Sequence, residues 1–367
     1  MLSVERVIRA LDHEEPDRVP SYESFGQAEA ADLFFPHDKR WDSSRERVLA
    51  ETRWWGRDLV GVGINAPNMK SEVIVSETGR RGFNIVREAW GSITYSRRIP
   101  GFHKVIHSPV RWPEDLDRID PPGLDRYESE IESLARDVEA YREAGYFVEA
   151  FHNGPFVMTW HWLRGMKGFL MDLTRDRGFA KKMVDFAMNQ QIELTKAIID
   201  ECRPHAVRLG NDMGTNESLF FPPRVYMEIF NPWERRLARE YHRSGVFVFH
   251  HCHGNINLIL KDMVAAGVDA IDPMDPDDGI DLAEVKEKYG DRITLRGGVS
   301  KFIGTYDREG IRDHVLDRLG IASPGGGYII QSAGGLPHDM PREYFDFYRD
   351  IIRKSRRYPP RALDYTR

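Results

Sequence analysis

The sequence predicts an α/β fold, organised as a single (β/α)8 TIM barrel that forms one domain over residues 1–367. Short β-rich apolar runs alternate with longer helical patterns over most of the chain, which is typical of parallel strands joined by helices. The main rival is an open doubly wound sheet that binds a nucleotide, but no G-x-G-x-x-G pattern follows the first strand. The eight expected strands lie at 18–24, 58–63, 146–151, 206–212, 246–252, 267–273, 292–298 and 327–333.

Helical patterns fill the segments between these strands. The clearest lie at 178–201, 223–243, 256–266 and 308–319. Residues 71–98 differ, because apolar and polar positions alternate there with a period of two around the turn-like segments "ETGRRG" and "AWGS". We therefore expect an antiparallel β-meander inserted after the second strand, where it would rim or cover the mouth of the barrel.

Composition and charge limit the classes of partner. The chain has 52 Lys and Arg against 58 Asp and Glu, a net charge of −6, whereas a nucleic-acid binder presents a basic face. The 2 cysteines cannot build a disulfide framework, which fits a reducing compartment. No run reaches the roughly 20 apolar residues of a membrane span, and the charged amphipathic start lacks the apolar run of a signal peptide. We expect a cytoplasmic protein that binds neither nucleic acid nor membrane.

The carboxyl ends of the expected strands are rich in polar and ionisable side chains. In a (β/α)8 barrel these ends form the mouth, where the chemistry takes place. The residues expected to bind a small-molecule substrate there are Tyr22, Glu23, His152, Asn153, Phe156, Asn211 and Arg296.

The strand end "FVFHHCHGNI" (247–256) carries three histidines and a cysteine in four consecutive positions. Because alternate residues of a strand face the same side, either His251 and His253 or His250 and Cys252 converge. Both pairs offer ligands that suit zinc, although a site normally has at least three protein ligands. The alternative is a structural role, with one histidine bonded to a backbone carbonyl and the cysteine in the core.

Three further residues are candidates to complete such a site. Asp212 ends the strand at 206–212, where its carboxylate can act as an acid or base, orient a histidine, or bind a metal. The same residue can equally cap the next helix. Glu217 and His338 are the other two candidate metal ligands.

Five segments, in this order, resemble the uroporphyrinogen decarboxylase superfamily, which also contains corrinoid-linked methyltransferases. They are "RVIRALDHEEPDRVP", "RLGNDMGTNESLFFPPRVYMEIFNPWERRLARE", "VFHHCHGNINLILKDMVAAGVDAIDPMDP", "YGDRITLRGGVS" and "PGGGYIIQSAGGLPHDMPREYF". The resemblance covers nearly the whole chain. It implies a (β/α)8 barrel, in agreement with the strand pattern, and a homodimer.

The resemblance also separates two branches of the superfamily. True uroporphyrinogen decarboxylases carry arginines that engage the carboxylates of their substrate, and the matching segment "SYESFGQAEAADLF" (21–34) has none. The methyltransferase branch binds zinc through His-x-Cys and a later cysteine. Alignment on Gly254 and Asn255 places His251 on that histidine, His253 on the first cysteine, and Gly334 near the second. The resemblance therefore implies a methyltransferase-like chain with an altered, histidine-rich site.

We expect an enzyme that transfers a methyl group on a small molecule, with a corrinoid protein or free cobalamin as partner. Asp212, His251 and His253 would be catalytic, and a divalent metal, zinc foremost, would bind His251 and His253 with Glu217 or His338. One alternative is a metal-independent decarboxylase in which Asp212 and a histidine handle the proton. The other is a homologue that binds a metabolite without turnover.

Overall fold

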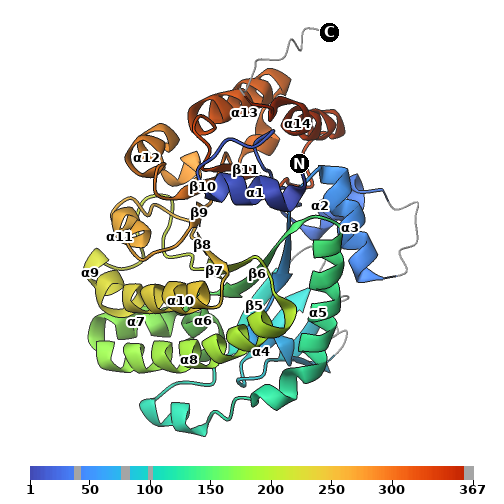
Figure 1. Cartoon of the computed structure of the whole chain (residues 1–367). Helices are drawn as coiled ribbons and strands as arrows, with labels where there is room; N and C mark the ends of the chain where they lie inside the picture. The colour runs from blue at the N-terminus through green and yellow to red at the C-terminus, as the bar shows by residue number, and fades with distance from the viewer. Residues whose placement is uncertain (37–42, 76–82, 98–101, 359–367) are drawn as a thin grey trace.

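A curled sheet of seven parallel strands forms the centre of the molecule, with the strands in chain order. The computed structural model describes residues 1–36, 43–75, 83–97 and 102–358. Figure 1 looks down the axis of the curl and shows helices around its outside. The strands are β1 (Leu59–Gly63), β6 (Phe147–Asn153), β7 (Ala206–Gly210), β8 (Phe247–His251), β9 (Ala270–Asp272), β10 (Thr294–Val299) and β11 (Tyr328–Ser332).

The outer layer consists of helices that return the chain from one strand to the next. The four expected helical segments are confirmed, although 256–266 is helical only at α11. Aspartates begin several of these helices: the Asp176 side chain accepts from the Phe179 N–H, and Asp307 accepts from Gly310. The helices are α1 (Ser3–Leu11), α2 (Ala28–Phe34), α3 (Ser44–Trp55), α4 (Ala66–Met69), α5 (Glu128–Glu143), α6 (Pro155–Thr159), α7 (Met166–Arg175), α8 (Arg177–Cys202), α9 (Pro223–Val225), α10 (Asn231–Arg243), α11 (Leu260–Val264), α12 (Leu282–Tyr289), α13 (Arg308–Ala322) and α14 (Arg342–Ser355).

The inner side of the curled sheet has two layers of different chemistry. An apolar layer lies towards the amino ends of the strands, where Leu59, Phe147 and Phe249 contact one another and Val7 of α1. A charged layer lies beyond it, where Arg296 donates to both carboxylate oxygens of Glu149 at 2.6 and 3.1 Å. The apolar layer lies at the amino ends of the strands, and the charged layer of the inner side lies towards the carboxyl ends, which we call the mouth.

Residues 18–24, expected as the first strand, do not form one. Ser21 makes a single parallel bridge to Ile330 of β11, and on the other side the Asp58 N–H donates to the Ser21 carbonyl at 2.9 Å. Pro20 has no N–H to extend the pairing. Of the eight predicted strands, the one at 18–24 was therefore wrong, and the other seven strands are confirmed.

A buried ionic cluster fastens this first segment to the end of the chain. The Asp58 carboxylate, fully buried, accepts from Arg6 at 2.6 Å, Arg18 at 3.1 Å and Arg356 at 2.7 Å. Burial raises the pKa of Asp58, but the guanidinium groups of Arg356, Arg6 and Arg18 outweigh it and hold that pKa below its usual value. The cluster joins α1, β1 and the residue after α14 in one contact.

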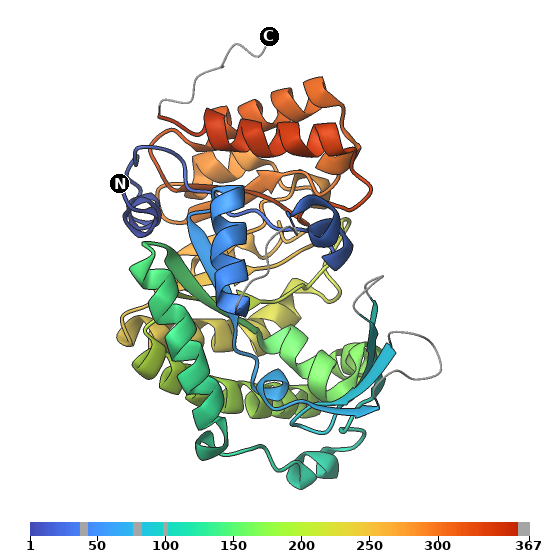
Figure 2. The same ribbon diagram turned by 90° about the vertical axis from the view of Figure 1, so that its right-hand side faces the viewer.

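An antiparallel meander follows β1, as predicted. Its strands, in spatial order, are β2 (Glu72–Val75), β3 (Phe83–Arg87), β4 (Ile93–Arg97) and β5 (Phe102–His107). It extends beyond the expected limit at residue 98, and the expected turn "ETGRRG" lies outside the described residues. Figure 2 shows these strands on the side of the molecule away from α1, which is the side of the mouth.

Among the described residues, no helix combines the length and the apolar character that a membrane crossing requires.

Candidate active site

A histidine and a carboxylate meet at the ends of two neighbouring strands. His251 ends β8 and Asp272 ends β9, and the register of the two strands places them side by side. Nδ1 of His251 lies 2.8 Å from Oδ2 of Asp272. Arg208 of β7 adjoins both: its Nε donates to Oδ1 of Asp272 at 2.9 Å, and its Nη2 lies 2.6 Å from Oδ2 and 2.7 Å from Nδ1 of His251.

Burial and the mutual electrostatic effects of Arg208, His251 and Asp272 determine which of these side chains are charged. Burial raises the pKa of Asp272, but Arg208, His251 and Arg296 hold it well below the usual value, so Asp272 is ionised. Burial and the charge of Arg208 lower the pKa of His251 and outweigh the opposing effect of Asp272. The imidazole is therefore neutral at neutral pH, and it is oriented by two fixed partners.

Asp212 and His253 extend the site to the surface of the mouth. Oδ1 of Asp212 lies 3.5 Å from Nε2 of His251 and accepts the backbone N–H of His253 at 3.1 Å. The Asp212 side chain is 52% exposed and that of His251 is 16% exposed. The rings of His251 and His253 are 5.0 Å apart at 87°. The structure thus brings together the three residues that were expected to be catalytic.

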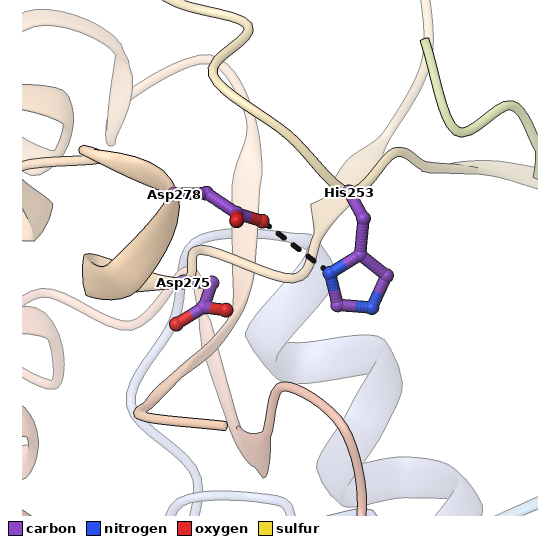
Figure 3. Close-up of side chains that lie close together, drawn as sticks. All are labelled: His253, Asp275 and Asp278. Atoms are coloured by element: carbon purple, nitrogen blue, oxygen red, sulfur yellow. Dashed lines mark hydrogen bonds and ion pairs between the residues drawn. The ribbon is translucent and has the colours of Figure 1, made fainter. Parts of the chain in front are cut away.

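A second group of donor atoms lies beside them. His253, Asp275 and Asp278 each offer a ligand atom, and these atoms lie within 4.8 Å of one another (Figure 3). Nδ1 of His253 is 3.4 Å from Oδ2 of Asp278. The backbone N–H of Gly254 donates to the same oxygen at 2.9 Å, so the turn after β8 positions the carboxylate.

Lys301 places a cation beside this donor group. Its ammonium lies 2.6 Å from Oδ1 of Asp278 and 3.3 Å from Oδ2 of Asp275. Burial alone would raise the pKa of Asp278, but His253, Lys301 and Gly254 hold it below the usual value. Burial raises the pKa of Asp275 to about 6. Oδ2 of Asp275 is buried, and besides the Lys301 ammonium at 3.3 Å it receives no hydrogen bond from the described residues.

Several residues expected in the pocket face the outer helices instead. His152 is buried, with Nε2 2.9 Å from the Tyr241 hydroxyl of α10. Asn211 donates to Oε1 of Glu234 at 2.8 Å and accepts from the Phe156 N–H at 2.9 Å. Phe156 is fully buried and lies in an aromatic cluster with Phe169, Phe220, Phe221 and Phe230. Asn153 follows on the inner side of β6; it is partly buried, and its backbone N–H donates to Oδ1 of Asn65.

Three other expected pocket residues have partners inside the protein. Arg296 is fully buried, and besides Glu149 its Nε donates to Gln331 at 2.6 Å. The Tyr22 ring lies 4.7 Å from the Arg296 guanidinium. Glu23 is buried and accepts from Ser332 and from the Tyr348 hydroxyl, and burial raises its pKa to about 7.

The structure does not bring Glu217 or His338 to the donor group. Glu217 is exposed, and its backbone N–H donates to the Thr215 hydroxyl. His338 is exposed and contacts Gln27. Of the four expected metal ligands, His251, His253, Glu217 and His338, only His253 is in the donor group of the structure. Asp275 and Asp278 stand in place of the other three.

Sequence reasoning missed Arg208, Asp275, Asp278 and Lys301. A signal existed for the aspartates, because "DPMDPDDG" (272–279) ends a strand with one aspartate and places three more directly after it. Arg208 lies in the middle of an apolar strand, where a charge is costly unless it is paired. Lys301 follows β10 on the mouth side and carried no motif of its own.

The comparisons agree with this architecture. The family model described as Uroporphyrinogen decarboxylase (URO-D) matches residues 97–355, more than half of the chain. The chain belongs to the uroporphyrinogen decarboxylase family. Within the family, the uroporphyrinogen decarboxylase of Nostoc punctiforme is 21% identical over 263 residues, which cover 68% of this chain and 70% of the relative.

A solved structure confirms the family fold over almost its full length. The methyltransferase from Methanosarcina mazei matches with a TM-score of 0.68 and 19% identity, covering 96% of this chain and 99% of that one. The resemblance of the five sequence segments to this superfamily is thereby confirmed.

Proposed function

We propose that the protein is a methyltransferase-like enzyme that acts on a small molecule in the mouth, with a divalent metal bound by His253, Asp275 and Asp278. The observation that carries the proposal is this donor group, in which the buried oxygen Oδ2 of Asp275 accepts no hydrogen bond from the described residues and is contacted by the Lys301 ammonium at 3.3 Å. The methyltransferase of matching fold supports the choice of reaction.

The charges of the mouth fit a bound cation. The buried carboxylates of Asp272, Asp275 and Asp278 contact the cations Arg208 and Lys301, and the half-exposed carboxylate of Asp212 lies beside them. A buried excess of negative charge is costly, and a divalent ion would neutralise it. One imidazole nitrogen and two carboxylates suit zinc and also harder ions such as manganese.

The residues around the donor group would orient the reactants. When bound, the metal would act as a Lewis acid that lowers the pKa of a thiol or water. Gly254 and Lys301 fix Asp278. Asp212 fixes the backbone of His253 and stands, half-exposed, where a substrate enters. We propose a corrinoid as the methyl carrier, because the family resemblance includes corrinoid-linked enzymes.

Metal content and methyl transfer test this function together. Protein purified without chelators should contain about one equivalent of metal, and Asp278→Asn should lose it while the exposed control Glu217→Gln keeps it. Decay of methylcobalamin with a panel of thiols, followed by absorbance, should require the metal. Absence of metal, together with stable methylcobalamin for every thiol tried and no methylcobalamin formed from cob(I)alamin and any aryl methyl ether tried, would refute the proposal.

A metal-independent decarboxylase is the second candidate, and Lys301 is the observation that favours it. Its ammonium already lies within 3.3 Å of both Asp275 and Asp278, which compensates part of their charge without a metal. The neutral His251 beside Asp272 would then assist the carbanion-like intermediate. Carbon dioxide release from aromatic or pyrrole acids that persists after chelation would favour this candidate. Tight metabolite binding without turnover would instead indicate a non-catalytic homologue.

We also propose that residues 18–24, although they do not form a regular strand, occupy the eighth position of the barrel, between β11 and β1. Tyr22 and Glu23 lie in this segment. The backbone bonds of this segment to Ile330 and Asp58 support this role. Amide exchange at Tyr22 as slow as in β11 would agree with it, and exchange as fast as in exposed loops would contradict it.

A further inference from the structure

A cavity separate from the donor group lies between the end of the meander and the segment that follows α6. Its volume is about 470 Å³, which falls within the roughly 300–1,000 Å³ of small-molecule pockets. Its walls come from residues 106–112, which include the end of β5, and from Arg164. No residue of this wall belongs to the donor group of the mouth.

Arg164 has a fixed position in this wall. Its Nε donates to Oδ2 of Asp172 at 2.6 Å and its Nη2 donates to Oδ1 at 3.3 Å. Its Nη1 has only a 3.4 Å contact with the Val110 carbonyl. Arg164 ends the π-helical turn Trp160–Arg164, and the Val110 N–H donates to the Leu163 carbonyl of that turn at 3.0 Å. The guanidinium is therefore held by Asp172, while Nη1 remains its least engaged donor.

Asp115 holds the backbone of Arg111 and Trp112. Its Oδ2 accepts both N–H groups at 2.8 Å, and its Oδ1 accepts from Arg118 at 3.1 Å. The Arg111 guanidinium is exposed and forms no ion pair within the part of the chain that the structure describes. Trp112 is 69% exposed. The backbone of this segment is thus fixed, whereas a charged and an aromatic side chain remain without partners that would occupy them.

The side chains that line the cavity offer hydrogen-bond donors and no carboxylate. Arg111 and Arg164 are cationic and have donors only. The Ser108 hydroxyl and the His107 ring can also donate, and Nε1 of Trp112 is a donor without acceptor capacity. A matching ligand must therefore supply acceptor oxygens and negative charge. The exposed indole adds a flat face on which an aromatic ring can stack.

We propose that this cavity binds a small ligand that carries an oxyanion group, a carboxylate or a phosphate, on a planar aromatic ring. The ring stacks on Trp112, and the oxyanion accepts from Arg111 and from Nη1 of Arg164. A guanidinium fork matches both kinds of oxyanion. Because Asp172 already compensates the charge of Arg164, Arg111 supplies the charge that attracts the ligand. This site is independent of the proposed function.

Calorimetric titration with 2-naphthoate, 2-naphthyl phosphate and the uncharged 2-naphthol tests the site. We expect saturable binding of at least one of the two anions, and 2-naphthol should bind about 10-fold more weakly or less because it offers no charge to Arg111. The anion that binds more tightly identifies the oxyanion. Binding should weaken as salt concentration rises, since Arg111 is exposed. No saturable binding of either anion, or equal affinity for 2-naphthol, would overturn the inference.

Variants locate the bound anion. Arg111→Gln should weaken binding about 10-fold, as for loss of a hydrogen bond to a charged group. Trp112→Ala should weaken it by a similar factor, about 10-fold, and Trp112→Phe, which keeps a ring, should weaken it less. Arg239→Gln is the matched control, because Arg239 is 61% exposed on α10 and outside the cavity, and it should bind as the wild type does. Equal affinity in Arg111→Gln and Arg239→Gln would overturn the inference.

His253→Ala separates this cavity from the mouth. The variant removes a side chain of the donor group and leaves the wall of the cavity intact, so it should bind the anion with unchanged affinity. Binding that is lost in His253→Ala and kept in Arg111→Gln would place the anion in the mouth and contradict the inference. Because both Arg111 and Trp112 are exposed, their variants should unfold at the wild-type temperature, so a loss of affinity reports the site and not the fold.

Discussion

His250 and His251 are neighbours on β8, and each is paired with a carboxylate on its own side of the sheet. Nε2 of His250 lies 2.9 Å from Glu234, with both side chains 0% exposed. Nδ1 of His251 lies 2.8 Å from Asp272, and His251 remains 16% exposed at the mouth. We call His250 and Glu234 the outer pair and His251 and Asp272 the inner pair. The outer pair is buried beneath α10, whereas the inner pair is accessible to a ligand at the mouth. The comparison shows that access, and not the histidine–carboxylate contact itself, separates a structural pair from a candidate catalytic one.

The outer pair should yield the largest effect, on stability. Glu234 accepts from His250, Asn211 and Tyr226, all buried. Glu234→Ala leaves these donors without an acceptor, so the free energy of unfolding should fall by about 3–5 kcal/mol. Urea denaturation measures this change, and a loss below about 1 kcal/mol would show that the outer pair is not structural.

On the mouth side, His253→Ala should affect turnover more than stability. It removes the imidazole of the donor group, and turnover should fall about 100-fold because Lewis-acid stabilisation is worth several kcal/mol. The His253 side chain is 31% exposed, so the unfolding free energy should change little. Cys252→Ala is the matched control, because Cys252 is buried on the outer side and should keep both metal and turnover. Equal losses of turnover in the two variants would contradict the division between the two sides.

Acid should destabilise the protein through the outer side of the sheet. Burial lowers the pKa of His152 from 6.5 to about 4, so between these values the unfolded chain binds the extra proton and stability falls as pH falls. From pH 6.5 to pH 5 this single group should remove about 1.5 kcal/mol. Denaturation of the wild type and of His152→Gln, which cannot be charged, should diverge over this range. Parallel curves would place His152 in a polar environment.

The smallest effects are expected for Glu217 and His338. Both side chains are exposed and lie outside the donor group. Glu217→Ala and His338→Ala should change the unfolding free energy by less than about 0.5 kcal/mol and leave metal content unaltered. Loss of metal from either variant would show that the substituted residue is a metal ligand after all.

The alternation along β8 could be predicted, because strand geometry alone sends His251 and Cys252 to opposite sides. The same alternation explains why the prediction for His152 was wrong. The strand was expected to end at residue 151, but β6 continues to Asn153; because Glu149 faces the inner side, residue 152 faces outward. Burial patterns of short strands fix such positions only when the strand limits are known.

The donor group could not be predicted from spacing. Asp275 and Asp278 lie in the loop after β9, and loops carry no periodic signal. Their approach to His253 depends on the bond from Gly254 to Asp278 and on the register of β8 with β9. Both are tertiary contacts, and neither leaves a mark on the local sequence.

The ionic cluster at Asp58 has a consequence for how the chain is completed. Asp58 meets Arg356 across 298 positions of sequence, and Glu23 meets Ser332 across 309. A chain made from its amino end must therefore wait for its contacts with Arg356 and Ser332 until nearly every other described residue has been synthesised. The contacts of Glu23 and Asp58 with the carboxyl-terminal part of the chain are therefore among the last that can form.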